Sequence, residues 1–316
     1  MSKNVTKKIL ISVSTVAFGI SALIVISQLH KQNNPGQMSD FAGYKKISRS
    51  ALYFPIKSQF DGARKIKLLI VPGHEPDAGG ADEFKKIKER DLNLQLSLLL
   101  KDNLSKNTDL EVILARDENG WNSDIENYVK TNESEIMKWV SAMKKKMFAK
   151  IDAGEVELID PNMKHNNAAS NAVLFLYGTN KWIDENNIDL VLHVHFNNNP
   201  KINGKPNYRG YCMYVPEKQY SNSSSSKIFA NYINEEISKI QKKSNMPQEK
   251  DIIIEDQQLI AVGNYNTLKI PSVLVEYAYI YEPLMTSSST RNIFIEKAES
   301  STATAINKYI EKEIIK

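Results

Sequence analysis

Residues that can bind a metal or transfer a proton follow three of the strands that the sequence predicts. The first strand leads to His74, the third leads to His195, and the fifth ends on Glu276. Glu89 lies near the start of the helix expected after the first strand. Ligands of open α/β sheets bind beyond the carboxyl ends of the strands, so these side chains are expected to meet there. Two imidazoles and a carboxylate that leave a fourth position open are typical of a catalytic zinc site.

Two histidines compete for the place at the end of the third strand. His193 and His195 lie two residues apart, so both side chains point to the same face of that strand. Either or both could bind the metal. His195 lies closer to the strand end, and we therefore expect it to be the ligand, with His193 as a wall or supporting residue. An unpaired acid beside a core costs several kcal/mol, so Glu276 is expected to meet water, a cation or a ligand.

Five apolar runs predict strands that would position these residues. They span 67–71, 111–115, 188–194, 210–215 and 271–276. Leucines at helical spacing predict a helix over 85–104, directly after the first strand. Strands that alternate with helices indicate an α/β fold whose mainly parallel sheet is covered on both faces.

A long segment that mixes polar and apolar residues separates the second and third predicted strands. Apolar residues recur at helical spacing from 122 to 151, which predicts one amphipathic helix. Residues 121–150 could cover the cleft as a lid, but we favour packing on the sheet. Lys144, Lys145 and Lys146 could face a membrane surface, although such a run is more often a solvated face near a helix end.

The N-terminal segment predicts the location of the protein. Residues 9–27 carry no charge, and a helix needs about 20 mostly apolar residues to span a membrane. A cleaved signal, the alternative, has an apolar region of about 7–15 residues. We expect 1–30 to be a cytoplasmic tip and transmembrane anchor, 31–64 a linker, and 65–316 a catalytic domain. Lysines before the anchor stay in the cytoplasm, which places that domain outside, in the cell envelope.

Charge and cysteine content exclude several classes of protein. The net charge of +4 is accounted for by the four lysines of residues 1–31, which leaves the rest of the chain neutral. A neutral body argues against nucleic-acid binding, which needs a surplus of Lys and Arg on one face. The single cysteine, Cys212, excludes an intramolecular disulfide, a Cys-ligated zinc finger and a Cys-x-x-Cys motif.

Six short motifs follow one another along residues 66–310. They are Pro-Gly-His at 72–74, Glu-Arg-Asp-Leu-Asn-Leu at 89–94, Leu-Ala-Arg-Asp at 114–117, His-Val-His-Phe-Asn at 193–197, Gly-Tyr-Cys-Met-Tyr at 210–214, and Pro-Ser-Val-Leu-Val-Glu at 271–276. Each is weak by itself. Together and in this order they resemble the zinc-dependent N-acetylmuramoyl-L-alanine amidases, the type 3 amidases that cut peptidoglycan.

The resemblance implies both a fold and a set of ligands. The fold would be a single α/β domain with a twisted central sheet, and here it would carry an inserted helical segment at about 118–166. By resemblance, His74, Glu89 and His195 would bind Zn²⁺. Glu276 would act as the general acid and base.

The resemblance also implies a reaction. The bond cut would join N-acetylmuramic acid to L-alanine in peptidoglycan, with a metal-bound water as the nucleophile. Asn197 and Arg116, which lie in the matching motifs, are expected to contact the substrate. Glu75 and Pro76 follow the first histidine where the family usually has glycine. A non-catalytic peptidoglycan-binding module and a zinc peptidase that cuts another amide therefore remain alternatives, and an activator protein is a possible further partner.

Overall fold

The computed structural model describes residues 64–76, 87–160, 170–197 and 208–315. These residues belong to one compact unit, Ser50–Lys316. The anchor predicted at 9–27 lies outside the described residues, as does all but the last residue of the predicted linker. No helix within the described ranges combines the length and the hydropathy needed to cross a membrane.

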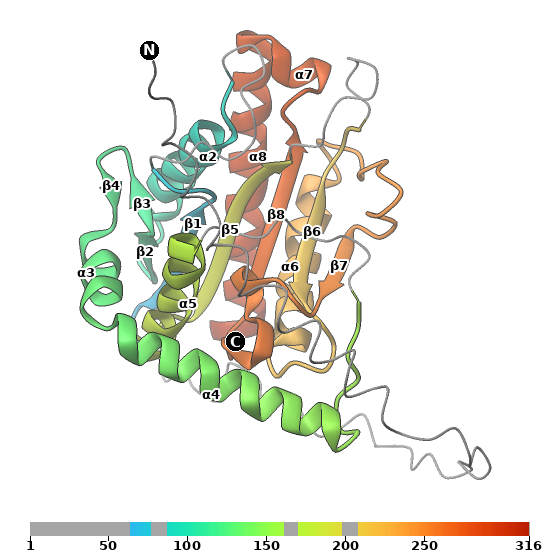
Figure 1. Ribbon diagram of the computed structural model, residues 1–316. Coiled ribbons are helices and arrows are strands. Elements are labelled where there is room, and N and C mark those ends of the chain that lie inside the picture. The colour runs from blue at the N-terminus through green and yellow to red at the C-terminus, as the bar shows by residue number, and fades with distance from the viewer. Residues whose placement is uncertain (1–63, 77–86, 161–169, 198–207, 316) are drawn as a thin grey trace, which may run out of the picture. The chain divides into compact units, whose positions relative to one another are not determined.

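A six-stranded sheet forms the centre of this unit, in the order β2-β1-β5-β8-β6-β7 (Figure 1). Its strands are β1 (Ile66–Pro72), β2 (Leu110–Leu114), β5 (Leu190–Asn197), β6 (Cys212–Pro216), β7 (Ile253–Asp256) and β8 (Ser272–Tyr279). All neighbours pair in parallel except β6 and β8, which are antiparallel. The mainly parallel α/β sheet expected from the sequence is confirmed, whereas β7 was not predicted.

Helices cover both faces of the sheet because β1 is apolar on both sides. Leu68 and Ile70 belong to a core shared with α2 (Glu89–Leu104), α6 (Ser223–Ile237) and α8 (Ser288–Tyr309). Leu69 and Val71 belong to a second core shared with α3 (Ser123–Thr131) and α5 (Ser170–Glu185). In Figure 1, α5 lies in front of the sheet and α8 lies behind it. Burial of each strand on two faces explains its continuous apolar sequence.

Short elements complete the unit. They are the hairpin β3 (Arg116–Asp117) and β4 (Gly120–Trp121), the helix α7 (Pro283–Thr286), the 3₁₀ turns η2 (Ile260–Val262) and η3 (Asn264–Asn266), and the π-helical turn η4 (Ile310–Ile315).

The single helix expected over 122–151 is wrong, because the chain forms α3 and α4 (Glu133–Asp152) instead. Asn132 separates them with a non-helical backbone, φ −111° and ψ 18°. Its side-chain amide donates to the carbonyl of Tyr128 at 2.8 Å. An asparagine that bonds to nearby backbone competes with the helix, and apolar spacing does not reveal such a break.

The helix α4 packs against α5 and the turn η3. Its buried residues Ile136 and Val140 join the core that contains α5, and Met147 packs with Tyr220 and Val156. Figure 1 shows α4 crossing the end of the sheet at which β5 begins. The structure supports a packing role for this helix, through α5 and η3.

Gly178 allows α5 to approach α3 and α4 closely. A Cβ atom at this position would lie 2.6 Å from Cγ2 of Val129 and 3.2 Å from Cδ1 of Ile136. We expect Gly178→Val to lower the free energy of unfolding by about 1–3 kcal/mol, because these side chains must move. Thermal unfolding followed by circular dichroism measures the change. Ala149→Val on the exposed side of α4 is the control, and an equal fall in Tm for both variants would contradict this account.

Candidate metal centre

The structure places the four candidate residues on four elements. His74 follows β1, Glu89 begins α2, His195 lies in β5, and Glu276 lies in β8. Sequence reasoning put His195 and Glu276 at or just beyond strand ends, but β5 continues to Asn197 and β8 to Tyr279. His195 and Glu276 are partners across these neighbouring strands. The site therefore lies on one face of the sheet, near the carboxyl ends of its central strands.

His74, Glu89 and His195 meet around one carboxylate oxygen. Oε1 of Glu89 lies 2.8 Å from Nε2 of His74 and 3.1 Å from Nδ1 of His195. The imidazole rings meet edge to face, with centroids 5.3 Å apart. Each residue offers one ligand atom within 4.8 Å of the others. Two imidazole nitrogens and one carboxylate oxygen form a donor set that suits zinc and leaves a coordination position open.

Glu89 is held in the ionised form that a metal ligand requires. Its side chain lies in the interior, with 4% of the residue exposed. Burial alone raises the pKa of this carboxyl, but hydrogen bonds from His195 and His74 outweigh it and bring the pKa to about 2. The carboxylate is therefore charged across the physiological range, as a metal ligand must be.

A strained turn presents His74 to this carboxylate. The backbone of His74 has φ 66°, in the left-handed region that residues other than glycine seldom adopt. The turn is fixed from both sides, since Gly73 N donates to Val194 O at 2.9 Å and Asn93 Nδ2 donates to Gly73 O at 3.2 Å. Local strain persists where surrounding bonds over-determine it, as they do here.

Arg116 supports the same turn. Its guanidinium donates to the carbonyls of Pro72 at 3.1 Å, Gly73 at 2.7 Å and Arg90 at 2.8 Å. Only 2% of the residue is exposed. Its Nε and Nη2 thus bind the backbone that carries His74, while the expected contact of Arg116 with substrate stays a prediction.

The carboxyl group of Glu276 has one oxygen without a hydrogen bond among the described residues. Its Oε2 is buried and makes no hydrogen bond with any residue that the structure describes. Burial raises the pKa of this carboxyl well above its ordinary value, and the charges of Glu89 and Glu249 raise it further. A carboxyl in such surroundings retains a proton more readily than an exposed one, which suits a group that must donate a proton.

His193, the alternative ligand, does not join the cluster. It is buried, and burial lowers its pKa to about 3, so the imidazole is neutral. A bond to the backbone of Ala261 opposes this shift. The cluster contains His195 and not His193, as expected from its position nearer the strand end.

Asn197 binds a carboxylate that the sequence did not single out. Its Nδ2 donates to Oε1 of Glu249 at 2.9 Å, and the residue is buried. This contact directs the amide nitrogen into the interior, and the expected contact of Asn197 with substrate stays a prediction. Glu249 was missed by sequence reasoning, because it lies between α6 and β7 in a stretch with no periodic pattern.

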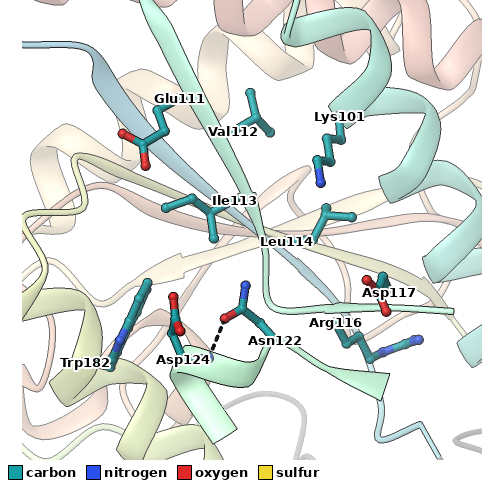
Figure 2. Close-up of a pocket in the computed structure, with 10 residues that line it drawn as sticks. All are labelled: Lys101, Glu111, Val112, Ile113, Leu114, Arg116, Asp117, Asn122, Asp124 and Trp182. Carbon is teal, nitrogen blue, oxygen red and sulfur yellow. Dashed lines mark hydrogen bonds between the residues drawn. The ribbon is translucent and has the colours of Figure 1, made fainter. Parts of the chain in front are cut away.

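A separate cavity of about 300 Å³ borders β2, the edge strand of the sheet (Figure 2). Figure 2 shows Lys101 on one side of this strand and Asp124 with Trp182 on the other. The remaining lining residues are Glu111, Val112, Ile113, Leu114, Arg116, Asp117 and Asn122. None of the three clustered ligands lines this cavity, so it is distinct from the candidate metal centre.

Comparison with known proteins gives one family. The family model described as N-acetylmuramoyl-L-alanine amidase matches residues 68–308. No curated protein matches the chain significantly.

Several solved structures are similar to the chain at low identity. The catalytic domain of CwlV, an N-acetylmuramoyl-L-alanine amidase from Bacillus (Paenibacillus) polymyxa var. colistinus, is 16% identical, with a TM-score of 0.48, over 78% of this chain and 98% of that one. An N-acetylmuramoyl-L-alanine amidase from Clostridium difficile 630 is 15% identical, with a TM-score of 0.49, over 79% of this chain and 100% of that one. The CwlD amidase from Clostridioides difficile, solved in complex with the GerS lipoprotein, is 18% identical, with a TM-score of 0.47, over 78% of this chain and 99% of that one.

Gly73 leaves the space that the ring of His195 occupies. A Cβ atom on residue 73 would lie 2.3 Å from Cε1 and 2.6 Å from Nδ1 of that ring. We therefore expect Gly73→Ala to displace His195 and to lose tightly bound zinc, measured by elemental analysis of the dialysed protein. Gly178→Ala, which is crowded by Val129 and not by a site residue, is the matched control and should retain zinc. Full zinc content in Gly73→Ala would contradict the role of this contact.

Proposed function

This chain belongs to the N-acetylmuramoyl-L-alanine amidase family, and we propose that it cleaves the amide bond between N-acetylmuramic acid and L-alanine in peptidoglycan with the help of zinc. The matched residues, 68–308, include all of the candidate ligands and Glu276. The observation that carries the proposal is the convergence of His74, Glu89 and His195.

These three side chains fit a catalytic zinc better than a structural one. They supply three ligands from separate elements, whereas structural zinc is almost always enclosed by four protein ligands. The donor set also suits a divalent cation, since an ionised carboxylate lies beside two imidazoles that can bind a metal in their neutral form. When bound, zinc would lower the pKa of a water molecule to near neutral, and the metal would also polarise the carbonyl that this water attacks.

Glu276 is proposed to move the protons of the reaction. It pairs with His195 across neighbouring strands, so its carboxyl lies on the same face of the sheet as the ligands. In its ionised form it accepts a proton from the attacking water, and it then donates a proton to the leaving nitrogen. Its buried surroundings favour the protonated form, which assists the second of these transfers.

The role of Glu276 can be tested by replacing it with glutamine. Glu276→Gln preserves size but cannot exchange a proton, so release of stem peptide from purified wall should fall by about 10²–10⁴-fold. Zinc content should remain equal to that of the parent, because the three ligands are unchanged. Mass analysis of the products released by the parent protein should show a new free amine on L-alanine.

The same assay separates the competing functions. A chelator should abolish activity of the parent, and added zinc should restore it. A new amine on another residue would instead indicate a zinc peptidase, and zinc-free parent protein that binds wall without cleaving it would indicate a binding module. Cleavage by Glu276→Gln at the parental rate would disprove the assigned role.

We also propose that residues 9–27 anchor the protein in the membrane, with the catalytic domain outside the cytoplasm. The support is the uncharged apolar segment behind three lysines, Lys3, Lys7 and Lys8. Such a location would bring the enzyme to peptidoglycan.

The anchor makes a prediction about extraction from membranes. Full-length protein should stay in the membrane fraction at alkaline pH and high salt, and only detergent should release it. A variant that lacks residues 1–30 and is produced in the cytoplasm should be recovered in the supernatant. Full-length protein that salt alone releases, or that is shortened at its N-terminus in cells, would contradict an uncleaved anchor.

A further inference from the structure

A buried carboxylate, Glu249, joins the three strands around Glu276. Only 1% of Glu249 is exposed. Its Oε2 accepts a hydrogen bond from the hydroxyl of Tyr279 at 2.6 Å, and its Oε1 accepts from Nδ2 of Asn197 at 2.9 Å and from the hydroxyl of Tyr214 at 3.3 Å. These donors come from β8, β5 and β6, so a single side chain links neighbouring strands of the sheet.

The linked residues lie just beyond an irregularity in the strand pairing. His195 pairs with Glu276, but the next pair is Asn197 with Tyr279. Two steps along β5 therefore correspond to three steps along β8. Because side chains alternate along a strand, the extra residue turns Tyr279 to the face that carries Glu276. Both members of the first pair after this bulge donate to Glu249.

We propose that Glu249 is a positioning residue for the reaction, which fixes this bulge and thereby the placement of the Glu276 carboxyl relative to His195. The inference rests on the proposed function. The third strand contributes to the same effect, since β6 brings Cys212 opposite Glu276 and Tyr214 to Glu249.

Charge makes the carboxylate suited to this task. A carboxylate only accepts hydrogen bonds, so it can satisfy three converging donors without rearrangement. Hydrogen bonds to an ionised acceptor are shorter and stronger than bonds between neutral groups, in agreement with the 2.6 Å contact from Tyr279. An amide at this place replaces one acceptor by a donor, so that one of the tyrosine hydroxyls must accept instead of donate.

The test compares steady-state kinetics and zinc content of the full chain. Glu249→Gln should lower kcat for stem-peptide release by about 10²-fold, the loss expected from a displacement of roughly 1 Å at a catalytic group. KM and zinc content should remain unchanged, because His74, Glu89 and His195 and their contacts with one another are kept. Tyr279→Phe, which removes one hydroxyl, should lower kcat by less, and the double variant should be no slower than Glu249→Gln alone.

Glu236→Gln is the matched control. Glu236 is also buried, but it lies on α6 and pairs with Lys239 and Lys308, so its replacement should leave kcat unchanged. Parental kcat in Glu249→Gln, or a loss of zinc from it, would overturn the positioning role. If that variant does not fold, parental kcat in Tyr279→Phe would overturn it equally. A parent that releases no stem peptide would instead refute the proposed function.

Discussion

One shared carboxylate oxygen organises the site. Oε1 of Glu89 contacts a ring nitrogen of both His74 and His195. His74 lies in the loop after β1, and His195 lies in β5. A charge buried to this extent is tolerated only when its partners are fixed, and the surrounding bonds serve this purpose. The fold is therefore constrained to bring the start of α2, the end of β1 and the face of β5 to one point.

Support for this point extends outward through backbone carbonyls. Arg116, the first residue of β3, donates to the carbonyls of Pro72 and Gly73, and Asn93 donates to Gly73 from the first turns of α2. Hydrogen bonds from a charged guanidinium are stronger than bonds between neutral groups. Arg116 therefore stabilises the turn that presents His74.

The elements that depend on burial of apolar side chains could be predicted from the sequence. The features that depend on pairing between distant strands could not. Apolar runs identified the strands that carry His195 and Glu276, because strands buried on both faces are continuously apolar. They did not identify β7, whose sequence Ile-Ile-Glu-Asp is only partly buried. The bulge beyond Glu276 and the contacts of Glu249 could not be predicted either, since both arise from register between strands distant in sequence. Likewise, the break at Asn132 depends on one side-chain bond.

The contact between Gly73 and His195 has an evolutionary consequence. Any side chain at position 73 competes for the volume of the imidazole, although both histidines and the strand would remain. One substitution outside the three candidate ligands can thus displace His195 and separate it from Glu89. Position 73 therefore limits which sequences can keep this cluster, although it contributes no donor atom to it.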